Sequence, residues 1–399
     1  MELIEWGIIR KNLLFPFFLL FFYLVRTLTK EKMESKRNNL KNPSHPFLYT
    51  FLMFLGEFIG SFIIFIYEKI KPKDAELKKS QLYSLFKVQC VNLESNHQEN
   101  QITKKIIFII FITCVLDAIS YSISVTIGFF QLSIIDKKVD SEWLIEIKLK
   151  IFQLIFSAFL CNKILKIQLH RHHNLSIYSI IILELFLITW DYFIILYNEF
   201  KIYISIILIL IFNTFLYSLQ EVLEKYLMDV KFLSINKLLY YQGIIGMTLT
   251  FIILIILNNI KCFDFLTKLS ICERNERIES FNSIFDLMQN FSYLFLSIIY
   301  ILLCSGANIY KLQTNKMMTP MHRTISDSAV MPIYIIIYYS NTNLNVLIIT
   351  LIFSLFVLFM CLIYCEVIVI KICNLNKNTY YYIAERGIDE VDKNLIIVN

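Results

Sequence analysis

The segment HPFLYTFLMFLGEFIGSFIIFIYEK, residues 45–69, contains the feature that most limits how this chain can fold. Within it, residues 47–67 form an apolar run of 21 residues interrupted by Glu57 at its middle. As a helix, the run spans roughly 31 Å, which matches a bilayer hydrocarbon core of about 30 Å. We therefore expect a membrane-spanning helix whose carboxylate faces the bundle interior, a water-filled cavity or a partner cation.

Nine further segments have a comparable character, so the sequence predicts an all-α integral membrane protein with about ten transmembrane helices. Hydrophobic residues make up 57% of the 399 residues, against about 45–50% in soluble proteins. We expect the first segment to stay in the protein, because no small-residue cleavage site follows it. The predicted spans are roughly 10–28, 47–68, 106–132, 144–162, 175–198, 202–224, 235–259, 291–311, 317–340 and 344–370.

The distribution of Lys and Arg predicts that both termini lie in the cytoplasm. With that orientation, 23 of the 38 Lys and Arg fall on the cytoplasmic side and 13 on the other side, as the positive-inside rule requires. The basic segment 26–46 favours the opposite orientation. Two hydrophilic loops follow from this topology, a cytoplasmic loop at 69–105 and a lumenal loop at 260–290 that carries an amphipathic helical pattern.

The spans divide into five and five near residue 200, which predicts two inverted repeats. A unit with an odd number of helices reverses its own topology when it is duplicated, as inverted-repeat transporters require. We therefore expect an N-terminal half at 1–200, a C-terminal half at 201–371 and a cytoplasmic tail at 372–399.

Several acidic residues fall inside predicted spans, where an ionised carboxylate costs about 2.5–3.5 kcal/mol on insertion scales. Glu57, Asp117 and Asp327 lie in the second, third and ninth spans. Two interpretations stay open: the side chains line an aqueous cavity, or they bond to neighbouring helices. The second is favoured for the remaining acids, Glu184, Asp191, Glu221 and Glu366.

The segment NIYKLQTNKMMTPMHRTISDS, residues 308–328, adds the basic residues Lys316 and Arg323. Arg323 and Asp327 are four residues apart and can pair on one helix face. Alternatively, Pro320 suits the first turn of a helix, whose N-terminus together with Lys316 or Arg323 would attract a phosphate or carboxylate.

The remaining motifs predict neither a metal site, a cofactor, an enzyme nor a nucleic-acid partner. HRHHN at 170–174 invites a metal interpretation, but a di-iron centre needs several histidine boxes and the chain has 6 His; a solvated basic loop is preferred. Cys262 and Cys272 share the 260–290 loop. They form a disulfide if the loop faces an oxidising lumen; alternatively, their occurrence in one loop is a coincidence.

Four stretches together resemble the drug/metabolite transporter superfamily, and within it the F-type branch of solute carrier family 35, the nucleotide-sugar-transporter-like group related to chloroquine-resistance-type transporters. HPFLYTFLMFLGEF (45–58) resembles the second-helix pattern of the family, with Glu57 on the family Glu. CVLDAISYS (114–122) resembles the third-helix segment, with Asp117 on the family Asp. The other two stretches are 218–246 and 308–328, which match the family at Gln220, Val222, Leu223, Glu224, Gly243, Gly246, Asn308, Lys316, Arg323, Asp327 and Ser328.

The resemblance covers residues 10–370 and implies a carrier for a small polar metabolite, such as a nucleotide sugar, an organic anion or an organic cation. It implies alternating access in an endomembrane such as Golgi, lysosome or vacuole, with no cofactor, and it leaves a homodimer open. The substrate-binding residues would be Glu57, Asp117, Asn308, Lys316, Arg323 and Asp327.

This chain departs from the family pattern at three positions, where it has Lys225, Gln242 and Val330. These positions line the cavity or the gates in the family, so the departures affect the expected substrate class. They also favour an alternative, a transport-inactive membrane scaffold whose partners dock on the 69–105 loop or the tail. A membrane enzyme is a third alternative that no sequence motif supports.

Overall fold

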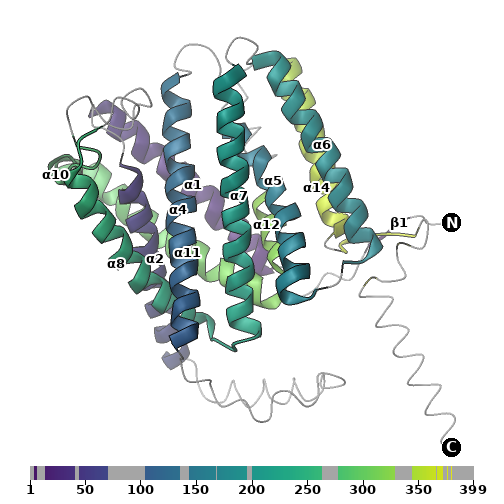
Figure 1. The fold of residues 1–399 in the computed structure, drawn as a ribbon, viewed down its shortest axis with the longest axis horizontal. Helices are drawn as coiled ribbons and strands as arrows, with labels where there is room; N and C mark the ends of the chain where they lie inside the picture. The colour runs from purple at the N-terminus through teal and green to yellow at the C-terminus, as the bar shows by residue number, and fades with distance from the viewer. Residues whose placement is uncertain are drawn as a thin grey trace, which may run out of the picture. The chain divides into compact units, whose positions relative to one another are not determined.

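The structure is a computed structural model that describes residues 4–6, 14–40, 45–70, 104–134, 143–167, 169–195, 200–262, 277–328, 344–364, 366–371, 375 and 379. These residues are almost entirely helical, with one pair of short strands (Figure 1). The elements are β1 (Ile4–Trp6), α1 (Leu14–Asn39), α2 (Pro46–Ile70), α4 (Lys104–Ile134), α5 (Trp143–Leu160), the π-helix η2 (Cys161–Leu165), α6 (Arg171–Ile195), α7 (Phe200–Asp229), α8 (Ile235–Asn259), α10 (Phe281–Gln289), α11 (Phe291–Met317), α12 (Pro320–Ser328), α14 (Leu344–Tyr364) and β2 (Ile368–Ile370).

The predicted all-helical architecture is confirmed for the described residues, and a helix begins within about four residues of each predicted span. The ends differ more. α1 continues to Asn39 instead of ending near 28, because residues 27–39 are rich in good helix formers and contain neither Gly nor Pro. α12 begins at Pro320 as expected, and the rest of the ninth span, 329–340, lies outside the described residues.

The predicted end of the tenth span, at 370, is wrong. α14 ends at Tyr364, and the chain then turns through Glu366, whose φ of 59° is left-handed. The backbone N–H groups of Glu366 and Val367 donate to the carbonyls of Ile363 and Leu362 at 3.1 and 3.0 Å, a Schellman-type helix end. The β-branched residues 368–370 form β2, which pairs antiparallel with β1.

Five of the described helices are long and apolar enough to cross a membrane: Pro46–Tyr67, Lys104–Thr126, Ile207–Asp229, Ile235–Asn259 and Phe291–Met317. Two shorter apolar helical segments are Phe152–Leu165 and Leu351–Tyr364. These lengths and compositions are compatible with a membrane-embedded protein.

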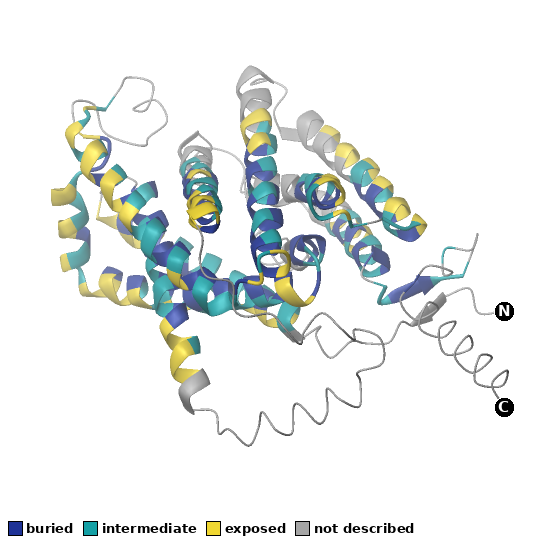
Figure 2. Ribbon diagram, turned by 60° about the horizontal axis from the view of Figure 1, so that its bottom comes forward, coloured by how far each residue is buried: buried dark blue, intermediate teal, exposed yellow. Residues whose placement is uncertain are grey.

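The chain folds as two compact units, and each draws on both predicted halves. Unit 1 comprises Met1–Leu20, Ile127–Val222 and Met317–Asn399, and unit 2 comprises Phe21–Thr126 and Leu223–Lys316. Helices in both units have a buried and an exposed side (Figure 2). In unit 2, the exposed side carries large apolar residues such as Phe65, Ile252 and Phe295, which are 46–55% exposed. An apolar outer surface of this kind suits contact with lipid.

In unit 1, α5 packs against α6 and α12, and α6 lies beside α14 (Figure 1). The β1–β2 pair, with Ile4 opposite Ile370 and Trp6 opposite Ile368, holds the start of the chain against the segment that follows α14. Buried apolar residues fill the space between these helices, among them Leu154, Ile180 and Tyr364.

In unit 2, α2 packs closely against α8 (Figure 1). The start of α2 is anchored by Glu279, which accepts a hydrogen bond from the Phe47 backbone N–H at 3.1 Å and lies 2.7 Å from the Nδ1 atom of His45. His45 Nε2 also bonds the Ser283 hydroxyl of α10 at 2.9 Å. The helix expected within the 260–290 loop is therefore confirmed as α10, and His45 ties it to the N-terminus of α2.

Gly243 sets the distance between α8 and α2, which gives a first prediction. A Cβ atom at Gly243 would lie 2.7 Å from the Phe58 backbone nitrogen, so the two helices would have to separate. We expect Gly243→Ala to lower the free energy of unfolding by about 1–3 kcal/mol, measured by titration with sodium dodecyl sulfate in detergent micelles.

Gly60→Ala is the matched control for Gly243→Ala. Gly60 is also helical, but its nearest neighbour is the Ser305 hydroxyl at 3.1 Å, which can rotate away. Both substitutions improve helix propensity by about 1 kcal/mol, so Gly60→Ala should be neutral or stabilising. Equal effects of the two variants would contradict a close α2–α8 contact at Gly243.

Candidate functional site

Three buried charged side chains meet inside unit 2: Asp117 of α4, Glu224 of α7 and Lys311 of α11. Lys311 Nζ lies 3.3 Å from Asp117 Oδ2 and 3.3 Å from Glu224 Oε1. All three side chains are at most 6% exposed. We refer to these residues as the Lys311 cluster. Because one ammonium faces two carboxylates, the cluster has a net negative charge when all three groups are ionised.

Polar groups from two more helices surround the Lys311 cluster. Gln242 of α8 donates from Nε2 to Glu224 Oε1 and to Thr113 Oγ1, each at 3.3 Å. The Cys114 thiol donates to the Gln242 carbonyl at 3.7 Å and has Glu57 among its charged neighbours. Glu57 itself is 1% exposed. The carboxylate of the opening motif is thus buried in the same unit as the Lys311 cluster.

Unit 1 contains a second buried ion pair, between Glu221 of α7 and Arg323 of α12. Arg323 Nε lies 3.0 Å from Glu221 Oε1. Glu221 also accepts hydrogen bonds from Gln153 Nε2 at 2.6 Å and from the hydroxyls of Ser157 and Thr324, each at 3.2 Å. We refer to these five residues as the Arg323 cluster. The Glu221 carboxylate is bonded on both oxygens, so this cluster ties α5, α7 and α12 together.

The predicted substrate-binding residues are divided between the two units. Glu57, Asp117, Asn308 and Lys316 belong to unit 2, whereas Arg323 belongs to unit 1. Asn308 is buried, and its Nδ2 atom makes no hydrogen bond. Lys316 is exposed, unlike a residue of a buried anion site.

The predicted pairing of Arg323 with Asp327 stays a prediction. Arg323 pairs with Glu221 on another helix. Asp327 is in α12, but its side chain lies outside the described residues. Cys262 is disulfide-bonded. Its predicted partner, Cys272, lies outside the described residues, so the Cys262–Cys272 pairing stays a prediction.

Sequence reasoning missed Lys311 and Gln153 as site residues. Lys311 had been assigned to a cytoplasmic loop because the eighth span was predicted to end there, whereas α11 continues to Met317. An ionisable residue at the edge of an apolar run is a signal that could have identified it. Gln153 carries no comparable signal, since its role depends on how α5 packs against α7.

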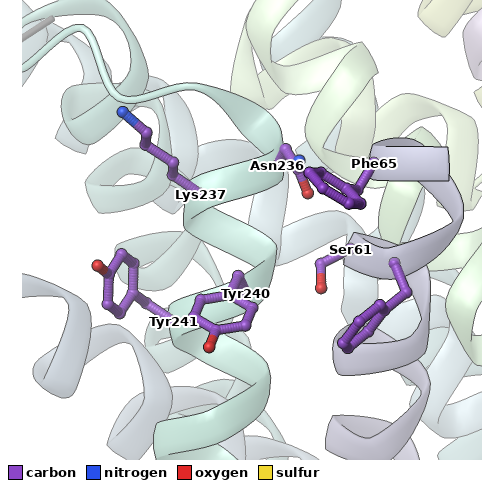
Figure 3. A pocket seen from close by; sticks show the side chains of 7 residues that line it. Ser61, Phe65, Asn236, Lys237, Tyr240 and Tyr241 are labelled. Atoms are coloured by element: carbon purple, nitrogen blue, oxygen red, sulfur yellow. The ribbon is translucent and has the colours of Figure 1, made fainter. Parts of the chain in front are cut away.

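A separate pocket of about 370 Å³ lies between α2 and the first turns of α8 in unit 2 (Figure 3). Aromatic residues dominate its lining, which comprises Ser61, Phe62, Phe65, Asn236, Lys237, Tyr240 and Tyr241. The volume is at the lower end for small-molecule pockets. Its single charged lining residue, Lys237, extends away from α2 in Figure 3, so this pocket offers little to orient a polar ligand.

Four histidines gather in unit 1, at the start of α6 and near the end of α14. The solvated loop expected for HRHHN is wrong for His172, which is 3% exposed. The rings of His172 and His173 have centroids 4.0 Å apart, and the His173 ring lies 4.7 Å from that of Tyr364. Burial, reinforced by the neighbouring His172, lowers the pKa of His173 to about 3, so this imidazole is neutral at neutral pH.

Comparisons with known proteins do not place the chain in a family. No family model matches it, and no curated protein matches it.

Proposed function

We propose that this protein is a multi-pass carrier of the drug/metabolite transporter type, related to solute carrier family 35. It would move a small polar metabolite across an endomembrane such as Golgi, lysosome or vacuole by alternating access. In this proposal, ten helices form two inverted five-helix repeats at 1–200 and 201–371. An alternating-access carrier needs two bundles that are packed separately, and the two compact units of this chain are suited to that requirement.

The observation that carries the proposal is which helices pack together. Counted along the ten predicted spans, α2 and α8 are the second and seventh, α5 and α12 the fourth and ninth, and α6 and α14 the fifth and tenth. Each of these pairs is in contact, and each joins helices five positions apart. Repeats related by a two-fold pseudo-axis in the membrane plane are expected to pair such counterparts.

The composition of the units supports the same relation. α4 and α11, the third and eighth helices, meet through Asp117 and Lys311 in unit 2. Unit 2 therefore combines the second and third helices with their counterparts, the seventh and eighth. Unit 1 combines the fourth and fifth with the ninth and tenth. α5 also packs against α6, so contacts between counterparts account for most, rather than all, of these helix pairs.

The buried acidic residues of unit 2 suggest which class of substrate the carrier would bind. Glu57, Asp117 and Glu224 are all buried, and buried ionisable groups in membrane proteins often mark ion or substrate pathways. An excess of carboxylates suits a cationic substrate or a co-transported proton. We expect Glu57→Gln to abolish uptake without preventing membrane insertion.

The uptake experiment requires a substrate, which a thermal-shift screen of the purified protein can supply. A ligand that binds the folded state raises the unfolding temperature, and nucleotide sugars, amino acids, peptides and organic cations form the panel. Uptake of the best ligand into proteoliposomes is then compared for wild type, Glu57→Gln and the control Asp286→Asn, which neutralises an exposed carboxylate of α10. Normal uptake by Glu57→Gln would refute the role of Glu57, and absence of uptake by wild type would refute transport.

A transport-inactive scaffold is the second candidate, and one observation favours it. Asp117 and Arg323, two of the predicted substrate ligands, are engaged in buried ion pairs between helices. Such pairs can serve packing alone. A scaffold would move no ligand in proteoliposomes and would instead retain partner proteins through the 69–105 segment or the tail.

A further inference from the structure

The histidine cluster at the start of α6 contains three potential metal ligands that come from two separate parts of the chain. One ligand atom each from His172, His173 and Glu366 lies within 4.8 Å of the other two. His172 and His173 are in the first turn of α6, whereas Glu366 follows α14. α6 and α14 lie side by side in unit 1 (Figure 1), so the fold itself brings the carboxylate to the imidazoles.

His172 provides a second, independent observation. It is 3% exposed, yet neither of its ring nitrogens makes a hydrogen bond. The nearest acidic oxygen, Glu366 Oε1, is 3.3 Å from His172 Nε2. Leaving a buried imidazole without hydrogen bonds is unfavourable, and a bound cation would remove that cost. Both the placement of His172 and its orientation towards Glu366 thus point to a ligand.

Further histidines lie around these three ligands. The His170 ring is centred 5.7 Å from the His173 ring, and the His322 ring of α12 is centred 5.9 Å from that of Tyr364. His170, His172, His173 and His322 are four of the 6 His in the chain.

We propose that His172, His173 and Glu366 bind a divalent transition-metal ion, tested here as Zn²⁺. Imidazole nitrogens and carboxylate oxygens are ligands that zinc accepts at about 2.0–2.2 Å, and three protein ligands leave a fourth position for water or another histidine of the cluster. The Irving–Williams order places zinc, copper and nickel above manganese and iron for such a donor set. The site was not predicted from the sequence, because Glu366 is almost 200 residues away from the HRHHN motif.

The ion would act as a clamp between α6 and the chain segment after α14. The backbone at Glu366 is left-handed, with a φ of 59°, at a helix end where glycine is favoured. Glutamate is conformationally less favourable than glycine at this position, but it supplies a carboxylate that glycine lacks. Because both elements belong to unit 1, the clamp would stabilise that unit regardless of whether the protein transports anything.

The test is zinc binding by the full-length protein, purified in detergent without a polyhistidine tag and treated with a chelator. Competition with a chromophoric zinc chelator gives the stoichiometry and Kd, and X-ray absorption of the zinc-loaded protein identifies imidazole ligands. We expect one equivalent of tightly bound Zn²⁺ and a higher unfolding temperature in its presence. His173→Gln should weaken binding at least about 100-fold, and Glu366→Gln at least about 10-fold.

His97→Ala is the matched control, because it removes a histidine of the 69–105 segment, outside the described residues, and should leave Kd unchanged. His172→Gln is the third ligand variant, and glutamine is chosen so that a buried polar group is kept. Size-exclusion profiles establish that each variant is folded. Absence of stoichiometric zinc binding by wild type, or unchanged Kd in both His173→Gln and Glu366→Gln, would overturn the proposal.

Discussion

Replacing Arg323 by alanine should lower the free energy of unfolding by about 3–5 kcal/mol. The substitution leaves the Glu221 carboxylate buried, with 0% of its side chain exposed, and removes the guanidinium 3.0 Å away. The hydrogen bonds from Gln153, Ser157 and Thr324 would remain, but neutral donors compensate only part of the cost of a buried charge. The measurement is the midpoint and slope of unfolding by sodium dodecyl sulfate in mixed micelles.

Two further variants separate the charge from the packing. Arg171→Ala is the matched control, since Arg171 is exposed at the start of α6 in the same unit, and it should change stability by less than about 0.5 kcal/mol. The double variant Glu221→Gln with Arg323→Met removes both charges while the glutamine oxygen still accepts hydrogen bonds. This double variant should regain most of the stability that Arg323→Ala loses. If the double variant is as unstable as Arg323→Ala, shape rather than charge accounts for the effect.

The sequence was sufficient to predict the helices because the signal is local. An apolar run of about 20 residues specifies a spanning helix on its own, and the predicted start at 291 coincides with that of α11. The ends were harder to predict. α1 extends eleven residues beyond its predicted end because helix propensity continues after the apolar run stops. α14 ends earlier than predicted, at a left-handed turn occupied by Glu366 instead of the glycine that would have marked a helix end in the sequence.

The candidate sites could be predicted only in part, because a partner across helices leaves no local pattern. Glu57 and Asp117 were identified as buried acids from their surroundings in the sequence, and both are buried. Lys311, the partner of Asp117, is almost 200 residues away. For Arg323, the i, i+4 rule indicates Asp327 of the same helix, a pairing that stays a prediction. The rule could not indicate Glu221 of α7, the partner that the structure describes, because it considers one helix at a time.

Glu221 and Glu224 show how one helix serves both units. They are three residues apart on α7, and Glu221 belongs to unit 1 whereas Glu224 belongs to unit 2. Each pairs with a cation of its own unit, Arg323 and Lys311 respectively. Substitution of Glu221 should therefore disturb the ion pair with Arg323, and substitution of Glu224 the ion pair with Lys311.

The largest loss is expected for Lys311→Met, which keeps the length of the side chain and removes its charge. Asp117 and Glu224 would both be left buried, each having lost an ammonium group at 3.3 Å. Breaking one buried pair costs about 3–5 kcal/mol, so the loss of two at once is comparable to the whole stability of many proteins. We expect little of this variant to be recovered as a single species, measured by size-exclusion chromatography of a fluorescent fusion.

Lys316→Met is the matched control, because Lys316 is on the same helix but exposed, and it should be recovered like wild type. The triple variant Asp117→Asn, Glu224→Gln and Lys311→Met removes all three charges of the Lys311 cluster and should restore recovery. It also separates the two candidate functions. A carrier that uses these charges would fold in the triple form and lose uptake, since packing alone does not require ionised groups, whereas transport does. Poor recovery of Lys316→Met, or normal recovery of Lys311→Met, would contradict the assignment of Lys311 as the cation that pairs with both acids.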